Sequence, residues 1–256
     1  STAIEEHFTM DNSALPANTI LSLAYDASNR CMYVGSSLGL VAYHERGTGF
    51  EGDAESHNEP VDYGSMMQWT THLAYADIED IQLSSAHVYA LSEGSLCAID
   101  RSDESLTYYS KLNGLNGSVI NHIAYDVHTQ TLVIAYEDGM IDLLDDNGNI
   151  HSVADIYLKQ INAKQVQDIA FRDGKAYMAM PFGIVVMNIR KQEITDTYYI
   201  GDEGAEVSVN AITLMGDSIY AASDNRLYRA SLKDNLVDYA KWQSQFMPGT
   251  ITNFIH

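Results

Sequence analysis

The sequence predicts an all-β protein, a β-propeller of four-stranded blades, and three observations support this fold class. A pattern of two short β-rich runs around a tight turn occurs five times. An apolar run precedes each copy, and a polar, amphipathic run follows it. The regular copies recur with a period of about 40 to 47 residues, which is typical of a propeller blade with four strands per repeat.

The central pair of runs in each repeat predicts a β-hairpin. We expect a glycine in four of the five turns, namely Gly39, Gly94, Gly139 and Gly183. The fifth turn has Asp224-Asn225, and these residue types also tolerate the left-handed backbone of a tight hairpin. The five segments are CMYVGSSLGLVAYHER (31–46), HVYALSEGSLCAIDRS (87–102), TLVIAYEDGMIDLLDD (131–146), KAYMAMPFGIVVMNIR (175–190) and SIYAASDNRLYRASLK (218–233).

The flanking runs complete each blade with a first and a fourth strand. First strands are expected at 19–26, 78–85, 119–126, 166–173 and 209–217. Fourth strands are expected at 68–75, 104–111, 193–200 and 236–243, with a weaker one near 149–158. One blade cannot bury its own sheet faces, so blades must stack against one another. We therefore predict one propeller domain over residues 1–256, with blade cores at about 19–46, 78–102, 119–146, 166–190 and 209–233.

Three segments depart from the regular repeat. The run at 4–15 predicts an outer strand of a preceding blade, and the run at 250–256 predicts the first strand of a following blade. Residues 47–68 form a polar, glycine-bearing insertion and are the best candidate for a linker or joint. The chain begins with STAIEE, without methionine or signal peptide, which is typical of a mature or excised fragment.

The charge of the chain excludes several partners. There are 35 acidic residues against 14 lysines and arginines, a net charge of −21. A nucleic-acid partner would need a basic face, and an anionic membrane surface would repel the chain. No stretch approaches 18 consecutive apolar residues, so we expect no transmembrane segment. Cys31 and Cys97 lie in strand-like runs and are expected to be small buried hydrophobes.

One short motif suggests chemistry, because residues 35–39 read Gly-Ser-Ser-Leu-Gly and match the G-x-S-x-G pattern of serine hydrolases. That nucleophile elbow needs a helix after the serine. The residues after Gly39 continue as a strand, so we interpret Ser36 and Ser37 as part of a hairpin.

The other candidate motifs are also better explained by structure. The run at 145–149 starts like a calcium loop, but Ile156 stands where that loop needs a glutamate, so we predict an Asn-Gly turn. The histidines show no metal-ligand spacing. Asp202-Glu203 and the acids Asp53 and Glu55 read as solvated loop charges. Trp69 and Trp242 are placed in outer strands, where they either pad the packing between blades or stack on sugars.

These readings leave no residue with a predicted catalytic, cofactor or metal role. We expect no catalytic, cofactor-binding or metal-binding residue and no cofactor. The residues that bind a ligand are not identified by any pattern. The sequon Asn116-Gly117-Ser118 would matter only in a glycosylating pathway, and it also reads as a turn between blades.

Several runs together resemble the N-terminal propeller of PorZ-like proteins of the type IX secretion system. They include YEDGMIDLL, FGIVVMNIRKQEITDTY and NLVDYAKW, and the resemblance covers residues 66 to 256. The stretch NSALPANTILSLAYDASNRCMYVGSSLGLVAYHER resembles the related two-component-regulator propeller blade. The resemblance implies a non-enzymatic, exported protein of Gram-negative bacteria, in the periplasm or at the cell surface. It further implies an accessory role in surface attachment, with lipopolysaccharide or a partner protein as ligand.

Two rival functions use the same fold. A periplasmic sensor propeller of a hybrid two-component regulator would bind an oligosaccharide and be followed by a membrane helix and a kinase. A propeller enzyme, such as a lyase or glycosidase, would need acids or histidines that converge at one mouth of the ring. No repeat copy shows such a cluster, so an enzyme is the weakest of the three hypotheses.

Overall fold

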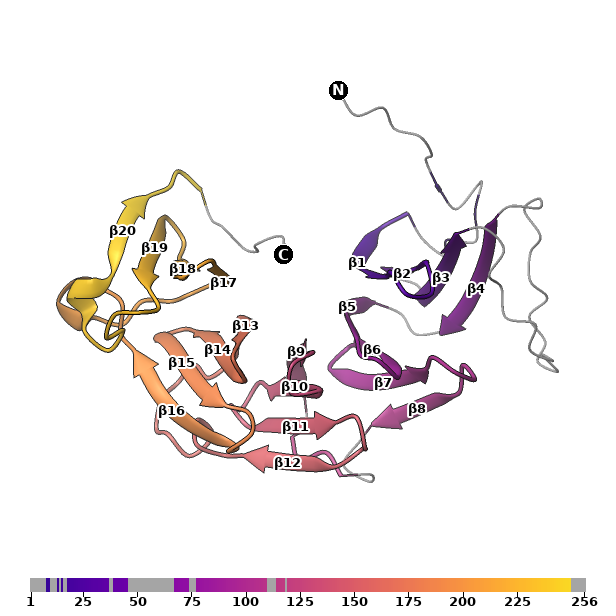
Figure 1. Ribbon diagram of the computed structural model, residues 1–256, viewed down its shortest axis with the longest axis horizontal. Coiled ribbons are helices and arrows are strands. Elements are labelled where there is room, and N and C mark those ends of the chain that lie inside the picture. Colours follow the sequence, from indigo (N-terminus) through magenta and orange to yellow (C-terminus); the bar gives the residue numbers. More distant parts are fainter. Residues whose placement is uncertain are drawn as a thin grey trace. The chain divides into compact units, whose positions relative to one another are not determined.

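The chain folds into four-stranded antiparallel sheets, five of which lie within the described residues (Figure 1). The computed structural model describes residues 8–9, 13, 15, 18–36, 39–45, 67–73, 77–109, 114–117 and 119–249. In every sheet the strands pair in sequence order, as in a meander. The predicted β-propeller class, with four strands per blade, is confirmed.

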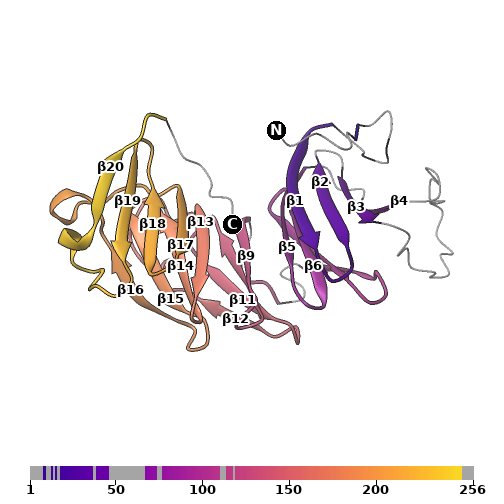
Figure 2. The same ribbon diagram turned by 45° about the horizontal axis from the view of Figure 1, so that its top comes forward.

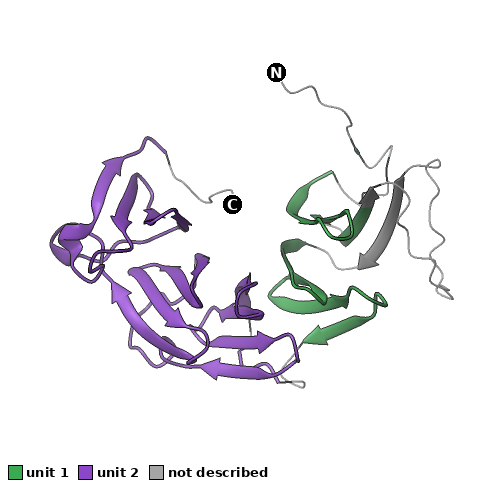
Figure 3. Cartoon of the chain, in the orientation of Figure 1, with its two compact units in different colours: residues 1–110 green, residues 111–256 purple. Residues whose placement is uncertain are grey.

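The chain divides into two compact units, residues 1–110 and 111–256 (Figure 3). The prediction of a single propeller domain over 1–256 stays a prediction. The first unit holds two sheets. One contains β1 (Ile20–Asp26), β2 (Cys31–Ser36), β3 (Gly39–Glu45) and β4 (Met67–Leu73), and the other contains β5 (Ile78–Leu83), β6 (His87–Ser92), β7 (Ser95–Asp100) and β8 (Leu106–Tyr109).

Within its described residues, the second unit holds three sheets and two short 3-10 helices. Its first sheet contains β9 (Ile120–Asp126), β10 (Thr131–Tyr136), β11 (Ile141–Asp145) and β12 (Ile150–Val153). The next contains β13 (Asp168–Arg172), β14 (Lys175–Met180), β15 (Gly183–Asn188) and β16 (Glu193–Tyr198). The last contains β17 (Ala211–Met215), β18 (Ser218–Ala222), β19 (Arg226–Ser231) and β20 (Gln243–Phe246), and the helices are η2 (Asp202–Gly204) and η3 (Tyr239–Lys241).

The core of each unit lies between the faces of adjacent sheets. The middle strands are therefore covered on both sides, and every residue of β10 is buried. This explains why β10 and β14 read as nearly continuous apolar runs instead of alternating ones. Within the second unit, β13 contacts both β9 and β17, as Figure 2 shows. The Asp168 carboxylate of β13 stabilises the contact with β17 by accepting a hydrogen bond from the Ile212 amide (2.8 Å).

The structure corrects two expectations about glycine. Gly94 and Gly139 lie in hairpin turns with φ of 71° and 85°. Gly39 and Gly183 are instead the first residues of β3 and β15. Pro181-Phe182 forms the two-residue turn before Gly183, since Met180 pairs with Gly183. Gly183 is required for another reason, because a Cβ there would lie 2.3 Å from the Tyr198 carbonyl oxygen.

A third correction concerns the last outer strand, expected at 236–243. The residues before Gln243 form the short helix η3, and strand β20 runs from Gln243 to Phe246. The Asp238 side chain accepts a hydrogen bond from the Ala240 amide (3.0 Å), which fixes a helical turn in place of an extended backbone. Trp242 is consequently a loop residue beside the sheet and not part of an outer strand.

The segments outside the regular repeat are mostly beyond the described residues. The run at 250–256 and most of the run at 4–15 lie there, as do residues 47–66 of the insertion. Met67 and Gln68, assigned to the insertion from the sequence, are the first residues of β4.

Candidate functional site

The Gly-Ser-Ser-Leu-Gly motif forms a β-hairpin, as expected. Strand β2 ends at Ser36, which pairs with Gly39 at the start of β3. Ser36 is completely buried, and strand, not helix, follows it. Ser37 lies outside the described residues. The motif therefore lacks the geometry of a nucleophile elbow. The absence of any catalytic residue in the chain stays a prediction.

The calcium-like run at 145–149 is a tight turn between β11 and β12, also as expected. The Asp145 carboxylate accepts hydrogen bonds from the backbone amides of Asn147 (2.9 Å) and Asn149 (2.8 Å). The side-chain amide of Asn149 adds a third hydrogen bond (2.9 Å). These hydrogen bonds, led by that from Asn149, lower the pKa of Asp145. Among the described residues, no group of three metal-ligating side chains lies together.

The two cysteines are buried thiols, and neither is part of a disulfide. Cys31 faces the core of the first unit from β2, and Cys97 does so from β7. Burial raises the pKa of the Cys31 thiol to about 12 and that of Cys97 to about 11. Both therefore remain protonated at neutral pH and act as small hydrophobic side chains.

Asp142 is a fully buried carboxylate in the first sheet of the second unit. It accepts hydrogen bonds from the Tyr136 hydroxyl (2.7 Å), the Ser152 hydroxyl (2.5 Å) and the Asn116 amide (2.8 Å). Gly117 packs flat against the Tyr136 ring, where a Cβ would lie 2.0 Å from a ring carbon. The network satisfies its own polar groups and anchors the incoming loop, so it is a structural feature and not a ligand site.

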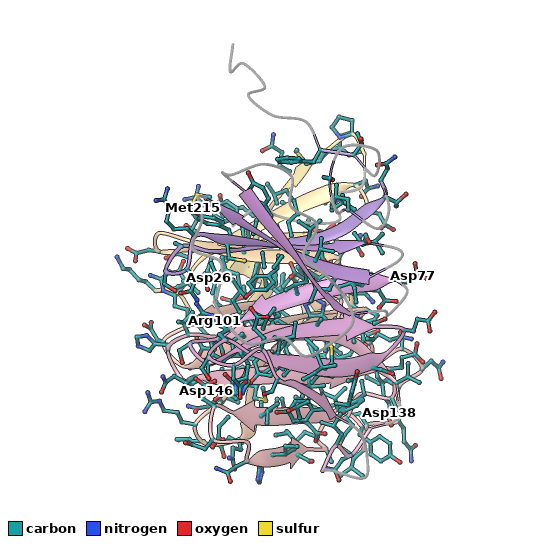
Figure 4. All side chains as sticks on the ribbon, turned by 90° about the vertical axis from the view of Figure 1, so that its right-hand side faces the viewer. Asp26, Asp77, Arg101, Asp138, Asp146 and Met215 are labelled. Atoms are coloured by element: carbon teal, nitrogen blue, oxygen red, sulfur yellow. The ribbon has the colours of Figure 1, made fainter. Side chains whose placement is uncertain are left out.

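A buried ion pair connects the two sheets of the first unit (Figure 4). Asp26 accepts a hydrogen bond from the Arg101 guanidinium, and Arg101 also donates to the Ser84 carbonyl (2.7 Å). A hollow of about 460 Å³ lies beside this pair. Ser28 and Asn29 line it but already donate to the Asp26 carboxylate. These polar groups close the turn, so the hollow is a weak candidate for binding.

The best candidate binding site is a pocket of about 230 Å³ beside the last sheet of the second unit. The short helices η2 and η3 border it. It combines aromatic residues, two acids and a serine on one concave surface. The lining residues are Ile200, Gly201, Asp202, Glu203, Tyr228, Tyr239, Ala240, Trp242 and Ser244.

The aromatic residues of this pocket are held in place by the fold. Trp242 is 8% exposed, and its indole N–H donates a hydrogen bond to the Leu236 carbonyl (3.0 Å). Its ring packs on Tyr198 with 6.3 Å between ring centroids. Tyr228, on β19, is 6% exposed, whereas Tyr239 on η3 is 45% exposed. The pocket thus has a rigid aromatic floor and one exposed aromatic edge.

The acids of the pocket sit on a constrained loop. The Gly201 amide donates a hydrogen bond to the Ala205 carbonyl (3.1 Å), and a Cβ on Gly201 would lie 2.6 Å from that oxygen. Glu203 adopts a left-handed backbone with φ of 58°. Within the described residues, neither Asp202 nor Glu203 forms a side-chain ion pair or hydrogen bond. The loop therefore presents two carboxylates that have no partner in the part of the chain that the structure describes.

The pKa of the Tyr228 hydroxyl is raised by burial and in part by the charge of Asp202. Burial raises its pKa, the charge of Arg226 opposes the rise, and the carboxylate of Asp202 adds to it. Arg226 itself donates a hydrogen bond to the Ser244 hydroxyl (3.0 Å) at the wall of the pocket. The pocket therefore has both acidic side chains and a neighbouring guanidinium at its wall.

Sequence reasoning found part of this site. It singled out Trp242 and the Asp202-Glu203 pair, but it treated them separately, as a blade aromatic and as solvated loop charges. The structure brings all three to one pocket. The sequence analysis missed Tyr228 and Tyr239, because no local pattern distinguishes a tyrosine in a pocket from the other tyrosines of the chain. The structure does not describe the Trp69 side chain.

Comparison with known proteins identifies the type of propeller. A family model described as the N-terminal β-propeller domain of PorZ of the type IX secretion system matches residues 88–243. A search of curated proteins finds no match. Among the described residues, no helix has the length and apolar character needed to cross a bilayer.

Solved structures with the same fold include PorZ of Porphyromonas gingivalis, described as a bacterial surface component of the type IX secretion system. It is 24% identical, with a TM-score of 0.60 over 68% of this chain. Two structures of the extracellular domain of BT4673 from B. thetaiotaomicron, described as a one-component and as a hybrid two-component system, also match. Their TM-scores are 0.65 and 0.55, at 17% and 15% identity over 97% and 92% of this chain. The chain spans 23%, 31% and 35% of the lengths of these three chains.

Proposed function

Because the chain belongs to the PorZ N-terminal β-propeller family, we propose that it is the propeller part of an accessory component of type IX protein secretion and cell-surface attachment. The observation that carries this proposal is the family match over residues 88–243, which includes most of four of the five described sheets. The protein would be exported and would work in the periplasm or at the outer-membrane surface.

We propose that its role is binding and scaffolding, without catalysis. The two ligand classes that the family implies are lipopolysaccharide and a partner protein. The net charge of −21 favours a partner protein with a basic surface, since the phosphates of lipopolysaccharide would be repelled at moderate salt. The pocket beside β19 and η3 supports the same choice, because its two acids have no ion-pair or hydrogen-bond partner among the described residues.

A second candidate is a sensor propeller of a two-component regulator, which would bind an oligosaccharide. The similarity to the BT4673 extracellular domain supports it, because that match covers 97% of the chain. A sensor would alter transcription when its ligand binds, whereas a secretion component would alter the location of cargo proteins.

Deletion of the encoding gene in its own bacterium, with complementation, separates these functions. We expect type IX cargo to be lost from the cell surface, while the transcriptional response to added oligosaccharides is unchanged. Immunoblots of surface, periplasmic and culture fractions, together with RNA sequencing, measure both. Normal cargo display with a lost oligosaccharide response would refute the secretion role and establish the sensor role.

A further inference from the structure

The sheet of β1 to β4 is apolar on both of its faces. Side chains alternate between the two faces of a strand. On one face, Tyr33 and Ala42 join the core that this sheet shares with the sheet of β5 to β8. The opposite face, here called the outer face, carries two rows of apolar side chains across β1, β2 and β3. The rows are Leu23–Val34–Val41 and Tyr25–Met32–Tyr43.

The composition of this outer face indicates that it is normally covered. An antiparallel sheet with one face in water usually carries polar side chains on that face. The sheet of β17 to β20 does so in part, because the face away from its core mixes polar and apolar side chains, namely Thr213, Ser218 and Arg229 beside Met215 and Tyr220. The two rows on the outer face of the first sheet contain no charged, serine or threonine side chain.

Two side chains near the N-terminus cover part of the outer face. Phe8 and Leu15 pack against Val34 and Val41. The rings of Phe8 and Tyr43 lie with 5.1 Å between their centroids, at a tilt of 53°. Val41 is completely buried, and Val34 is 6% exposed. The N-terminal segment, defined here by these two anchor residues, thus shields the outer face over β2 and β3.

The shielded area ends before β1, and it is separate from the main core of the unit. Leu23 is 61% exposed although it lies in the same row as Val41, and Tyr25 of the next row is 46% exposed. Phe8 and Leu15 belong to no strand, so neither of them extends the hydrogen-bond ladder of the sheet. Their cluster shares no residue with the core between the two sheets. A contact of this kind can open locally while the sheet stays folded.

From these observations we infer that the outer face of the first sheet is a separable docking surface, and that its occupant is the N-terminal segment of the same chain. The surface fits a segment with one aromatic and one aliphatic anchor seven positions apart, as Phe8 and Leu15 are. Docking removes apolar surface from water and hides it from other chains. A second copy of the unit is a poorer occupant, because residues 1–110 contain 17 acidic and three basic residues and would repel one another.

Cysteine modification tests this docking in the intact chain. Val41→Cys places a thiol in the shielded part of the outer face, and the matched control Leu23→Cys places one in the exposed part of the same row. The rate of reaction with a maleimide is measured for each variant, alone and combined with Phe8→Ser and Leu15→Ser. We expect the double substitution to accelerate the reaction of Val41→Cys about tenfold or more, because the shielding contact is lost. The rate for Leu23→Cys should not change.

The native cysteines show whether the sheet itself stays folded. Cys31 and Cys97 lie in the core on the other face of the sheet, and burial raises the pKa of both thiols. They should therefore remain unmodified in every variant. Mass spectrometry of proteolytic fragments assigns the modified thiols. Modification of Cys31 as fast as that of Val41→Cys would mean that the sheet unfolds with the contact, which would overturn a separable docking surface.

The segment can also be supplied as a separate peptide. A synthetic peptide of residues 6–17, EHFTMDNSALPA, is added to Val41→Cys that carries both serine substitutions. We expect saturable recovery of protection with this peptide and none with a control peptide that has serine in place of Phe8 and Leu15. Equal effects of the two peptides, or an unchanged Val41→Cys rate in the double variant, would overturn the docking surface. Protection that rises with protein concentration, without peptide, would replace the N-terminal segment with a second copy as the occupant.

Discussion

At the scale of single residues, two hairpin turns contain a glycine because the backbone there has a positive φ. Gly139 has φ of 85°, and Gly148 in the next turn of the same sheet has φ of 83°. The surroundings of the two glycines differ. A Cβ on Gly139 would lie 2.9 Å from the Lys164 Cβ, whereas nothing lies within 4 Å of a Cβ on Gly148. Substitutions at Gly139 and Gly148 therefore distinguish the cost of backbone strain from the cost of steric contact.

Gly139→Val is expected to destabilise the fold by about 2 to 4 kcal/mol, through a strained left-handed valine and the contact with Lys164. Gly148→Val should cost about 1 to 2 kcal/mol, because only the backbone strain applies. Urea unfolding followed by circular dichroism measures both free energies. Equal losses in the two variants would contradict the steric role of the Gly139 site, and an unchanged Gly139→Val variant would contradict the turn itself.

The aspartates that bond to other segments illustrate a second point at this scale. Asp26, Asp142 and Asp168 each accept hydrogen bonds from another strand or loop, and none of them faces a ligand pocket. Asp202, by contrast, is exposed and lacks a partner among the described residues. The function of an aspartate here depends on whether the fold already uses its oxygens.

At the scale of elements, equivalent turns in two sheets carry the same cap. Asp26 closes the turn between β1 and β2, where its carboxylate accepts the Ser28 amide (3.0 Å). Asp126 closes the turn between β9 and β10 and accepts the His128 amide (3.2 Å). Among the described residues, Asp26 also forms an ion pair with Arg101 of the second sheet, whereas Asp126 forms no such pair. The difference allows the cap and the cross-link to be measured separately.

Asp26→Asn should cost about 2 to 4 kcal/mol of stability near neutral pH, because the Arg101 guanidinium loses the carboxylate that balances its charge. Asp126→Asn, the matched control, should cost about 1 kcal/mol, since asparagine can still close the turn. Burial alone would raise the pKa of Asp26. The hydrogen bonds from Ser28 and Asn29 and the charge of Arg101 outweigh burial and lower it.

The sign of the pH dependence follows from this lowered pKa. The stabilisation by Asp26 is complete above the unfolded pKa of about 4 and is lost as the pH falls through the lower folded value. The stability difference between the wild type and Asp26→Asn should therefore be full at pH 6 and shrink below pH 4. A difference that stays constant down to pH 2 in urea unfolding would disprove the charge contribution.

At the scale of the whole molecule, the acidic charge is unevenly distributed. Residues 1–110 contain 17 acidic and three basic residues, whereas residues 111–256 contain 18 and 11. Such an excess keeps a chain soluble but opposes its compact state by self-repulsion. The first unit therefore has more to gain from screening by salt.

Raising sodium chloride from 20 mM to 500 mM should increase the unfolding temperature of the chain, with the larger increase in the first unit. A Trp242→Phe variant leaves Trp69 as the fluorescence reporter of residues 1–110, and Trp69→Phe leaves Trp242 for residues 111–256. Thermal unfolding followed by tryptophan fluorescence compares them. An equal or reversed salt effect would show that local ion pairs, not net charge, govern stability.

The sequence by itself determined the strand count per blade, the hairpin positions and the fold class. These features depend on neighbours in the chain: the alternation of apolar runs with turns, the turn residues and the repeat period. The same local logic correctly assigned the Gly-Ser-Ser-Leu-Gly motif to a hairpin, since the residues that follow it form a strand.

Only the tertiary structure decided which side chains meet. The pocket joins Asp202 and Glu203 of one loop to Tyr228 on β19 and to Tyr239 and Trp242 on and after η3, residues up to 40 positions apart. The misplaced outer strand has the same origin, because the Asp238 cap forms a helical turn in a segment that has the pattern of a strand. Hydrophobicity and turn propensity can be read from neighbouring residues in the sequence. A binding site depends on contacts between distant segments, which the repeat period does not predict.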